Sequence, residues 1–216
     1  KLPLPFLEEL KATDTELLSE HLGYEVPSYI NENLSHTLRD YQEAAIRFFH
    51  YSQNLEGHRE KPNHLLFNMA TGSGKTDLMA ALILYLYQEE AVQNFLFVVN
   101  TKGVVSKTIE NLTNSKSSKY LFSKNIEIES KRINIEKVSR FPSIPSKNTI
   151  YIKLDTIQTI SSDLFSVKEN TMPAQDYSRN RTVILGDEAH HYSASTKKQK
   201  DAERSWESAI NIILNA

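Results

Sequence analysis

The sequence predicts an α/β fold built on a parallel β-sheet that carries helices on both faces. Three observations support this prediction. Short apolar runs alternate along the chain with longer segments of helical periodicity, which is typical of parallel sheets. A glycine-rich loop, "MATGSGKT" (69–76), follows the first apolar run, and an acidic pair, "DE" (187–188), follows the last. Ligands of such folds bind at the carboxyl ends of the strands, where both motifs are expected to lie.

The composition is that of an ordinary soluble globular protein. Of the 216 residues, 39% are hydrophobic and 24% are charged, and this length suits one large domain. The formal net charge is -2, so any surface for nucleic acid has to come from local basic patches. The chain has no cysteine, which excludes disulfides and zinc–thiolate sites and agrees with a cytoplasmic location. No run approaches the roughly 20 apolar residues of a membrane span.

The chain is expected to start with an extension, residues 1–36, which holds three prolines and one short helical segment near residues 13–21. A helix is expected over residues 38–52, because apolar side chains recur there at helical spacing. The side chains that define this spacing are Leu38, Tyr41, Ala45 and Phe48 or Phe49. Phe48, Phe49 and Tyr51 are interpreted as core residues.

Apolar runs predict the strands of the sheet: "HLLFN" (64–68), "FLFVVN" (95–100), "NTIYIKL" (148–154) and "TVILGDE" (182–188). Two short alternating runs within residues 126–138 predict a β-hairpin that turns around residues 130–132. Further helices are expected from the glycine-rich loop to about residue 89, over residues 104–112 and over residues 203–214, where Trp206 is interpreted as a packing residue. The first of these is apolar on nearly all sides, which predicts burial against the sheet.

The glycine-rich loop has the composition of a phosphate-binding loop. Successive backbone N–H groups in a tight loop form a concave anion site, and the helix that follows adds its positive N-terminal end. Gly72 and Gly74 allow the backbone to approach phosphates, Lys75 would contact the β- and γ-phosphates, and the hydroxyl of Thr76 would bind Mg²⁺. The strict pattern has glycine where this chain has Met69. The alternative is a glycine-rich turn that binds nothing.

The acidic pair adds two carboxylates, which a phosphate loop alone does not provide. Two carboxylates at the end of a buried strand are costly unless a cation compensates them. Asp187 would hold Mg²⁺ through water, and Glu188 would position and polarise the attacking water. The alternative is that Asp187 caps the N-terminus of a helix.

Together, "MATGSGKT" and "DEAH" resemble the first RecA-like domain of superfamily 2 helicases and translocases, which are P-loop NTPases. In this family an apolar residue in place of the first glycine is common. The segment "LRDYQEAAI" (38–46) resembles the family's Q-type motif, which implies that Gln42 contacts adenine and that Arg39 supports the site. The resemblance implies an ATP site formed by Arg39, Gln42, Thr71, Gly72, Ser73, Gly74, Lys75, Thr76 and His190. Within it Lys75, Asp187 and Glu188 would be catalytic, and Thr76 and Asp187 would bind Mg²⁺.

Two further segments resemble motifs that contact a DNA strand. They are "VVNTKGVVSKT" (98–108), with Thr101, Lys102 and Ser106, and "DTIQTISSD" (155–163), with Gln158 and Thr159. The second segment has an alternative interpretation, a helix cap by Asp155 or Thr156, and both interpretations stay open at this point.

The chain most resembles the Res subunit of type III restriction enzymes, on "TIQT" followed by "SSDLF", on "DEAHH" and on "SWESAI". This resemblance covers residues 37–216 as a DEAH-type RecA-like domain, with the second such domain and a nuclease core absent from the chain. It implies ATP-driven action on double-stranded DNA and a partner modification (methyltransferase) subunit. We expect the chain to bind Mg-ATP but to hydrolyse it poorly, because the arginine fingers of a second domain are missing.

Two other functions stay open. The chain could be the motor domain of another superfamily 2 protein, such as a repair helicase or a type I restriction motor, or it could be an ATP-switched DNA-binding module. A small-molecule kinase is disfavoured, because a kinase does not need strand-contacting motifs.

The remaining polar residues are weaker candidates. His190 and His191 are not expected to bind zinc, because no second pair of ligands stands at suitable spacing. Scattered basic residues would form either DNA contacts or a solvated face; they are Lys116, Lys119, Lys124, Lys131, Arg132, Lys197, Lys198 and Lys200.

Overall fold

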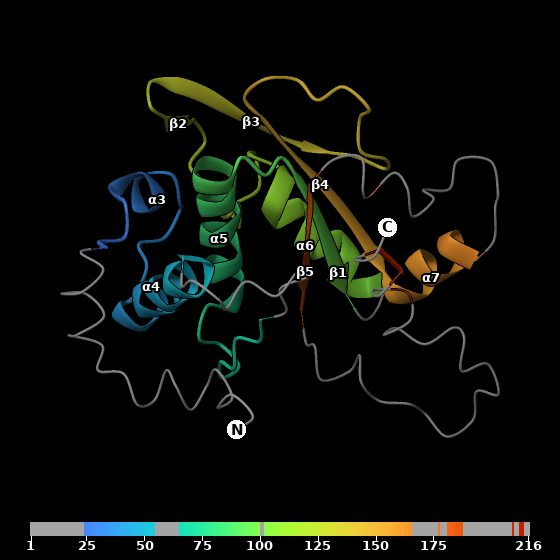
Figure 1. The fold of residues 1–216 in the computed structure, drawn as a ribbon, viewed down its shortest axis with the longest axis horizontal. Helices are drawn as coiled ribbons and strands as arrows, with labels where there is room; N and C mark the ends of the chain where they lie inside the picture. The colour runs from blue at the N-terminus through green and yellow to red at the C-terminus, as the bar shows by residue number, and fades with distance from the viewer. Residues whose placement is uncertain are drawn as a thin grey trace.

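The sheet has five strands in the order β2-β3-β4-β1-β5 (Figure 1). In this computed structural model, the described residues are 24–54, 65–99, 102–165, 177, 181–187, 209, 212 and 213. The strands are β1 (Asn94–Val99), β2 (Ile126–Ile128), β3 (Lys131–Lys137), β4 (Thr149–Thr156) and β5 (Thr182–Gly186). All neighbours pair in parallel except β2 and β3, which form an antiparallel hairpin. The predicted parallel sheet is therefore confirmed, with one antiparallel strand at its edge.

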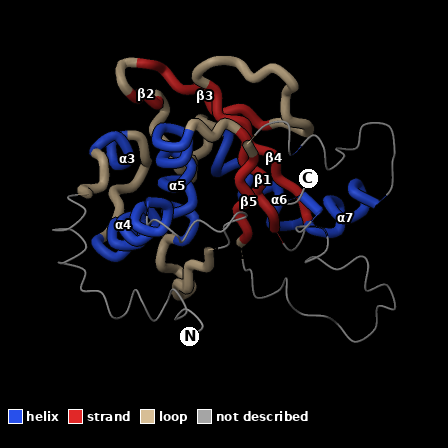
Figure 2. The backbone as a smooth tube through the Cα atoms, viewed as in Figure 1, coloured by secondary structure: helices blue, strands red, loops and turns tan. Residues whose placement is uncertain are grey.

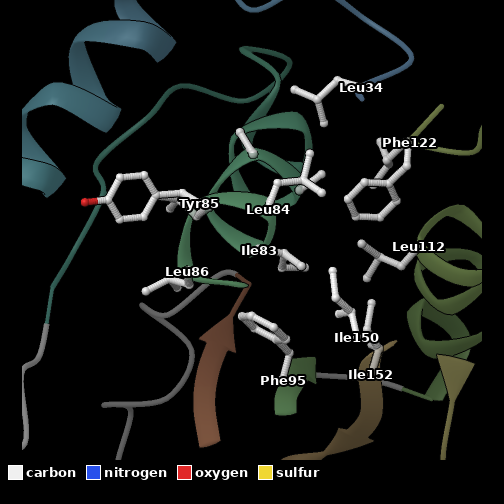
Figure 3. Packing of buried hydrophobic residues seen from close by; sticks show 14 of the residues in the cluster. Leu34, Ile83, Leu84, Tyr85, Leu86, Phe95, Leu112, Phe122, Ile150 and Ile152 are labelled. Atoms are coloured by element: carbon white, nitrogen blue, oxygen red, sulfur yellow. The ribbon is translucent and has the colours of Figure 1, made fainter. Parts of the chain in front are cut away.

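One face of the sheet packs against α5 (Lys75–Glu90) and α6 (Lys102–Thr113). Strand β1 turns Phe95 and Phe97 towards this face, and β4 contributes Ile150 and Ile152. Helix α5 is buried on nearly every side, as its sequence predicts; its buried residues are Leu78, Ala80, Ala81, Leu82, Ile83, Leu84, Tyr85 and Leu86. Figure 3 shows Leu84 beside Phe122 and Ile83 next to Phe95 of the sheet. This layer is the main core of the protein.

The other face of the sheet packs against α7 (Ile157–Phe165). Alternation along β1 turns Leu96 and Val98 to this side, where they meet Tyr151 and Ile160 in a second, smaller cluster. Residues 209, 212 and 213 are also helical, and Ile213 belongs to this cluster. Helices therefore cover both faces, which confirms the predicted fold class (Figure 2). In the described part of the chain, no helix has the length and hydropathy needed to cross a membrane.

The segment before the first long helix packs onto the same core. Ile30, in α3 (Ser28–Glu32), and Leu34 are buried in the main cluster. The amide of Asn33 bonds to the backbone of Glu127 in β2, and Leu34 forms an isolated bridge with Phe122. These contacts attach residues 24–36 to the hairpin.

Helix α4 (Asp40–Asn54) lies on the side of α5 that faces away from the sheet. It confirms the helix predicted over residues 38–52. Phe48, Phe49 and Tyr51 are all half-buried. Only Phe49 packs against the main core, so the interpretation of Phe48 and Tyr51 as core residues was wrong.

Three sequence predictions differ from the structure. "HLLFN" was expected to form a strand, but residues 65–68 have no regular structure, and Leu66 is 80% exposed. An apolar run becomes a strand only where a neighbour completes its hydrogen bonds. The hairpin turns at Glu129 and Ser130, not at residues 130–132, because these two residues adopt the left-handed φ of 51° and 59° that a two-residue turn requires. Tyr41, placed on the apolar stripe of its helix, is 45% exposed.

Candidate functional site

The glycine-rich loop folds as a tight turn immediately before α5. The carbonyl of Ala70 accepts bonds from the backbone N–H and the hydroxyl of Ser73, at 3.3 and 2.6 Å. Gly72 and Gly74 have φ of 78° and 76°, values that glycine adopts without strain. The ammonium of Lys75 lies 3.4 Å from the Ala70 carbonyl. The loop thus places a lysine and the N-terminus of a 16-residue helix at one point.

The first turn of α4 holds this loop from one side. Gln42 is 3% exposed, and its Nε2 donates to the carbonyl of Gly74 at 2.9 Å. Its Oε1 accepts the backbone N–H of Arg39 at 2.8 Å, the bond that a residue three positions into a helix makes back to its cap. Gln42 therefore caps its own helix and binds the loop with the same amide group.

Tyr41 makes a second contact between α4 and the loop. Its hydroxyl donates to the carbonyl of Ser73 at 2.7 Å and accepts a bond from the guanidinium of Arg39 at 3.0 Å. The three predicted neighbours Arg39, Gln42 and Gly74 are thus brought together, and Tyr41 joins them.

A third contact involves the segment just before α4. His36 Nδ1 lies 3.1 Å from Oδ1 of Asp77, in the first turn of α5. The His36 side chain is 67% exposed and that of Asp77 26% exposed. Residues 36–42 therefore contact residues 73–77 at three separate points.

Asp187 follows β5, and its backbone N–H donates to the carbonyl of Val98 at 3.1 Å. Helix α5 is joined to β1 by three residues, 91–93, and β5 runs parallel to β1. The start of α5 and the ends of β1 and β5 consequently lie at the same end of the sheet. Asp187 therefore lies at the same end of the sheet as Lys75 and Thr76, the first residues of α5.

Four of the five residues predicted to contact DNA belong to helices that start at this end of the sheet. Val99, the last residue of β1, is paired with Thr156, the last residue of β4. Helices α6 and α7 therefore start from neighbouring strand ends. Lys102 and Ser106 belong to α6, and Gln158 and Thr159 belong to α7. The side chain of Gln158 is exposed.

The helix-cap interpretation of residues 155–163 holds for Thr156. Its hydroxyl accepts the backbone N–H of Thr159 at 3.3 Å and bonds the Thr159 hydroxyl at 3.0 Å. Asp155 is not the cap, because it forms an ion pair with the buried Lys153 of its own strand. Thr156 thus fixes the first turn of α7.

The basic residues before and in the hairpin are exposed: Lys116, Lys119, Lys124, Lys131 and Arg132. Their surroundings are of mixed charge. Lys131 lies 3.5 Å from Glu129, and Arg132 is paired across the hairpin with Glu127. This favours the solvated-face interpretation for the hairpin, since acidic neighbours reduce the local positive potential.

Several predicted residues lie outside the described part of the chain: Thr101, Glu188, His190, His191, Lys197, Lys198, Lys200 and Trp206, together with the helical segment near residues 13–21.

Sequence reasoning missed three residues of this region, His36, Tyr41 and Asp77. Tyr41 is adjacent to Gln42 in the sequence, and this adjacency is the only signal that could have pointed to it. His36 and Asp77 are brought together by the fold across 41 residues, and no local pattern marks them.

Comparison with known proteins gives two relatives. A family model described as "Type III restriction enzyme, res subunit" matches residues 35–216. The probable type III restriction-modification enzyme HindVIP Res subunit of Haemophilus influenzae is 37% identical over 211 residues, which cover 95% of this chain and 39% of that protein. The type I restriction enzyme EcoKI endonuclease subunit of Escherichia coli K12 is 25% identical over 176 residues, or 82% of this chain and 13% of that protein. No solved structure matches the chain.

Proposed function

The chain belongs to the family of type III restriction enzyme Res subunits, and we propose that it forms the part of such an enzyme that binds Mg-ATP and drives movement on double-stranded DNA. The observation that carries this proposal is the loop of residues 70–75, held by Gln42 and Tyr41 at the N-terminus of α5. The chain spans 39% of the Haemophilus relative, so the activity of the whole enzyme is part of the proposal.

The loop is chemically suited to a nucleoside triphosphate. Backbone N–H groups at a helix N-terminus attract phosphate oxygens, and an ammonium group adds a full positive charge. We assign phosphate binding to residues 71–74 and Lys75, and base recognition to the segment that holds Arg39 and Gln42. His190 is assigned to the same site by the family resemblance.

The residues at this end of the sheet also fit a divalent cation. Hydroxyl and carboxylate oxygens are the ligands that Mg²⁺ prefers, and Thr76 and Asp187 would supply them. When bound, the ion would neutralise charge on the phosphates. Glu188 would orient the attacking water and accept its proton.

The proposed DNA surface is formed by the starts of α6 and α7. Thr101, Lys102, Ser106, Gln158 and Thr159 would contact phosphate and sugar groups of one strand, which carry no base information. The pairing of Val99 with Thr156 supports a single continuous surface, because it places the two helix starts side by side. A partner modification subunit that recognises the DNA site, and a cytoplasmic location, also remain proposals.

A type I restriction motor is the second candidate. The 25% identity to the Escherichia coli protein favours it, but the family model and the higher identity to the Res subunit favour type III.

The proposal is tested by nucleotide titration and by ATP hydrolysis with the 216-residue chain. Lys75→Ala is expected to weaken Mg-ATP binding roughly tenfold to a hundredfold, since a hydrogen bond to a charged group contributes about 1.5–3 kcal/mol. Glu188→Gln is expected to retain binding and to lose the slow hydrolysis. Lys147→Ala is the matched control, because Lys147 is exposed and precedes β4 at the opposite end of the sheet.

Unchanged binding in Lys75→Ala would refute the nucleotide site. Turnover as fast as that of an intact motor would contradict the expectation that this chain hydrolyses Mg-ATP poorly.

A further inference from the structure

The first turn of α4 places two hydrogen-bond donors on successive carbonyl groups of the phosphate loop. The hydroxyl of Tyr41 donates to Ser73 O at 2.7 Å, and Nε2 of Gln42 donates to Gly74 O at 2.9 Å. Tyr41 and Gln42 are adjacent in the sequence, as are the two carbonyls they bind. The bond from Tyr41 to Ser73 is not explained by the roles proposed for the nucleotide-binding residues.

The effect of such a contact follows from the planarity of the peptide group. The carbonyl of residue 73 and the N–H of Gly74 belong to one rigid trans peptide and point in opposite directions. A donor that holds the Ser73 carbonyl towards α4 therefore turns the Gly74 N–H away from α4. The bond from Gln42 to the Gly74 carbonyl acts in the same way on the next peptide, which carries the N–H of Lys75.

Because Gly74 has a left-handed φ of 76°, the peptide groups on either side of it need other groups to hold their orientation. Glycine has several backbone conformations of similar energy, so the peptides on either side can rotate unless another group holds them. Successive N–H groups bind an anion well only when they converge on it. Fixing the two carbonyls from outside is a direct way to keep the N–H groups convergent.

Arg39 strengthens the contact made by Tyr41. Its guanidinium donates to the Tyr41 hydroxyl oxygen at 3.0 Å, so that hydroxyl accepts from a cation while it donates to Ser73. Accepting such a bond polarises the O–H group and makes it a better donor. The side chain is not buried to serve the core, because Tyr41 is 45% exposed.

We propose that Tyr41 is a positioning residue of the nucleotide site, whose hydroxyl orients the Gly74 N–H towards the phosphate groups of the bound nucleotide. This rests on the proposed function, since it takes the loop to be a phosphate site. Tyr41 acts on the phosphate-bearing part of the ligand and not on the base.

The test compares Tyr41→Phe with the wild-type chain in binding titrations with ATP, ADP and adenosine. Tyr41→Phe keeps the ring and removes only the hydroxyl. It is expected to weaken ATP and ADP binding about three- to tenfold, the equivalent of one neutral hydrogen bond, and to leave adenosine binding unchanged. The thermal unfolding midpoint without nucleotide is expected to stay the same.

Tyr51→Phe is the matched control. Tyr51 lies on the same helix and is half-buried, and within the described residues its hydroxyl makes no hydrogen bond. All three affinities should be unchanged in this variant.

Two results would overturn the inference. The first is a Tyr41→Phe chain that binds ATP and ADP as tightly as the wild-type chain. The second is a loss of adenosine affinity equal to the loss of ATP affinity, which would show that the substitution acts on base recognition or on the fold. Lys75→Ala separates this failure from failure of the proposed function. If Lys75→Ala weakens ATP binding as expected while Tyr41→Phe does not change it, only the role of Tyr41 is refuted.

Discussion

Gln42 lies so close to Gly74 that position 74 has no room for a side chain. A Cβ atom built on Gly74 would lie 2.6 Å from Nε2 of Gln42, the nitrogen that donates to the Gly74 carbonyl. Gly72 has nearly the same φ, but a Cβ atom there would have no neighbour within 4 Å. The two glycines therefore separate the effect of backbone strain from that of steric contact.

Alanine at position 72 and alanine at position 74 are expected to have unequal effects. Both substitutions impose a left-handed φ on a residue with a Cβ atom, which costs about 1–2 kcal/mol in unfolding free energy. Gly74→Ala also displaces Gln42, so it should lose more stability and should lose nucleotide binding. Urea unfolding and ATP titration of the two variants measure this difference. Equal losses in both would show that the contact with Gln42 is unimportant.

The contact between Gln42 and position 74 predicts that substitutions at the two positions have non-additive effects on the free energy of unfolding. Gln42→Ala removes the nearest atom to a Cβ at position 74 and leaves Asp77 Oδ2, at 3.0 Å, as the next one. The double variant Gln42→Ala/Gly74→Ala should therefore lose less stability than the sum of the two single variants. A strictly additive result would contradict the geometry.

Asn33 is expected to be the strongest single link between residues 24–36 and the hairpin. It is 3% exposed; its Nδ2 donates to the carbonyls of Tyr29 and Glu127, and its Oδ1 accepts the Glu127 N–H, each at 2.8 Å. Asn33→Ala removes three side-chain hydrogen bonds, two of them to the backbone of Glu127, and should cost about 2–3 kcal/mol. Asn33→Asp should also destabilise, because a carboxylate cannot donate to the two carbonyls. Asn134→Ala, on the exposed side of β3, is the control, and an equal loss there would contradict this role.

Thr156 is expected to stabilise the start of α7 through its hydroxyl. Thr156→Val keeps the shape but removes the acceptor of the Thr159 N–H, which should cost about 1 kcal/mol, whereas Thr156→Ser should retain most of the stability. If Gln158 and Thr159 contact DNA, Thr156→Val should also weaken DNA binding and Thr156→Ser should restore it. Chemical unfolding and a DNA-binding titration would check both parts. Equal stability of the two variants would refute the cap.

The sequence was a good guide to elements whose pattern depends on burial alone. Helix α5 is apolar on nearly all sides, and a helix with no polar face can only be stable inside the protein, as observed. β1 was predicted for the same reason, since all six of its residues are buried. The glycine-rich loop was identified from its glycines and lysine, and Gly72 and Gly74 adopt the positive φ that glycine takes without strain.

The errors arose where a tertiary partner decides the outcome. Residues 65–68 have the composition of a strand, but composition does not supply a neighbouring strand. Glu129 and Ser130 adopt a left-handed backbone that their side chains do not favour, so the turn could not be placed from residue types. Tyr41 fits the helical period of an apolar face, and only its contact with Ser73 across 32 residues shows that its hydroxyl is used.

His50 connects the N-terminal segment to the two long helices. Its ring stacks on Tyr24 with ring centroids 3.5 Å apart, and its Nδ1 lies 2.7 Å from the hydroxyl of the buried Tyr85. Burial lowers the pKa of His50 from its usual value of 6.5, and this outweighs the opposite effect of Glu89 and Glu90. The neutral ring can accept the Tyr85 hydroxyl at Nδ1, whereas the protonated ring cannot.

The lowered pKa predicts that stability falls in mild acid. Above pH 6.5 His50 is neutral in both folded and unfolded chains, so it contributes no pH dependence. As pH falls below 6.5 the unfolded chain binds the proton first, and the free energy of unfolding decreases until the pH passes the folded pKa. Urea unfolding at pH 7.5 and pH 5.5 would measure this loss. His50→Gln, whose amide can still accept the Tyr85 hydroxyl, should show a smaller difference between the two pH values. An undiminished difference in His50→Gln would assign the pH dependence to other groups and contradict the prediction.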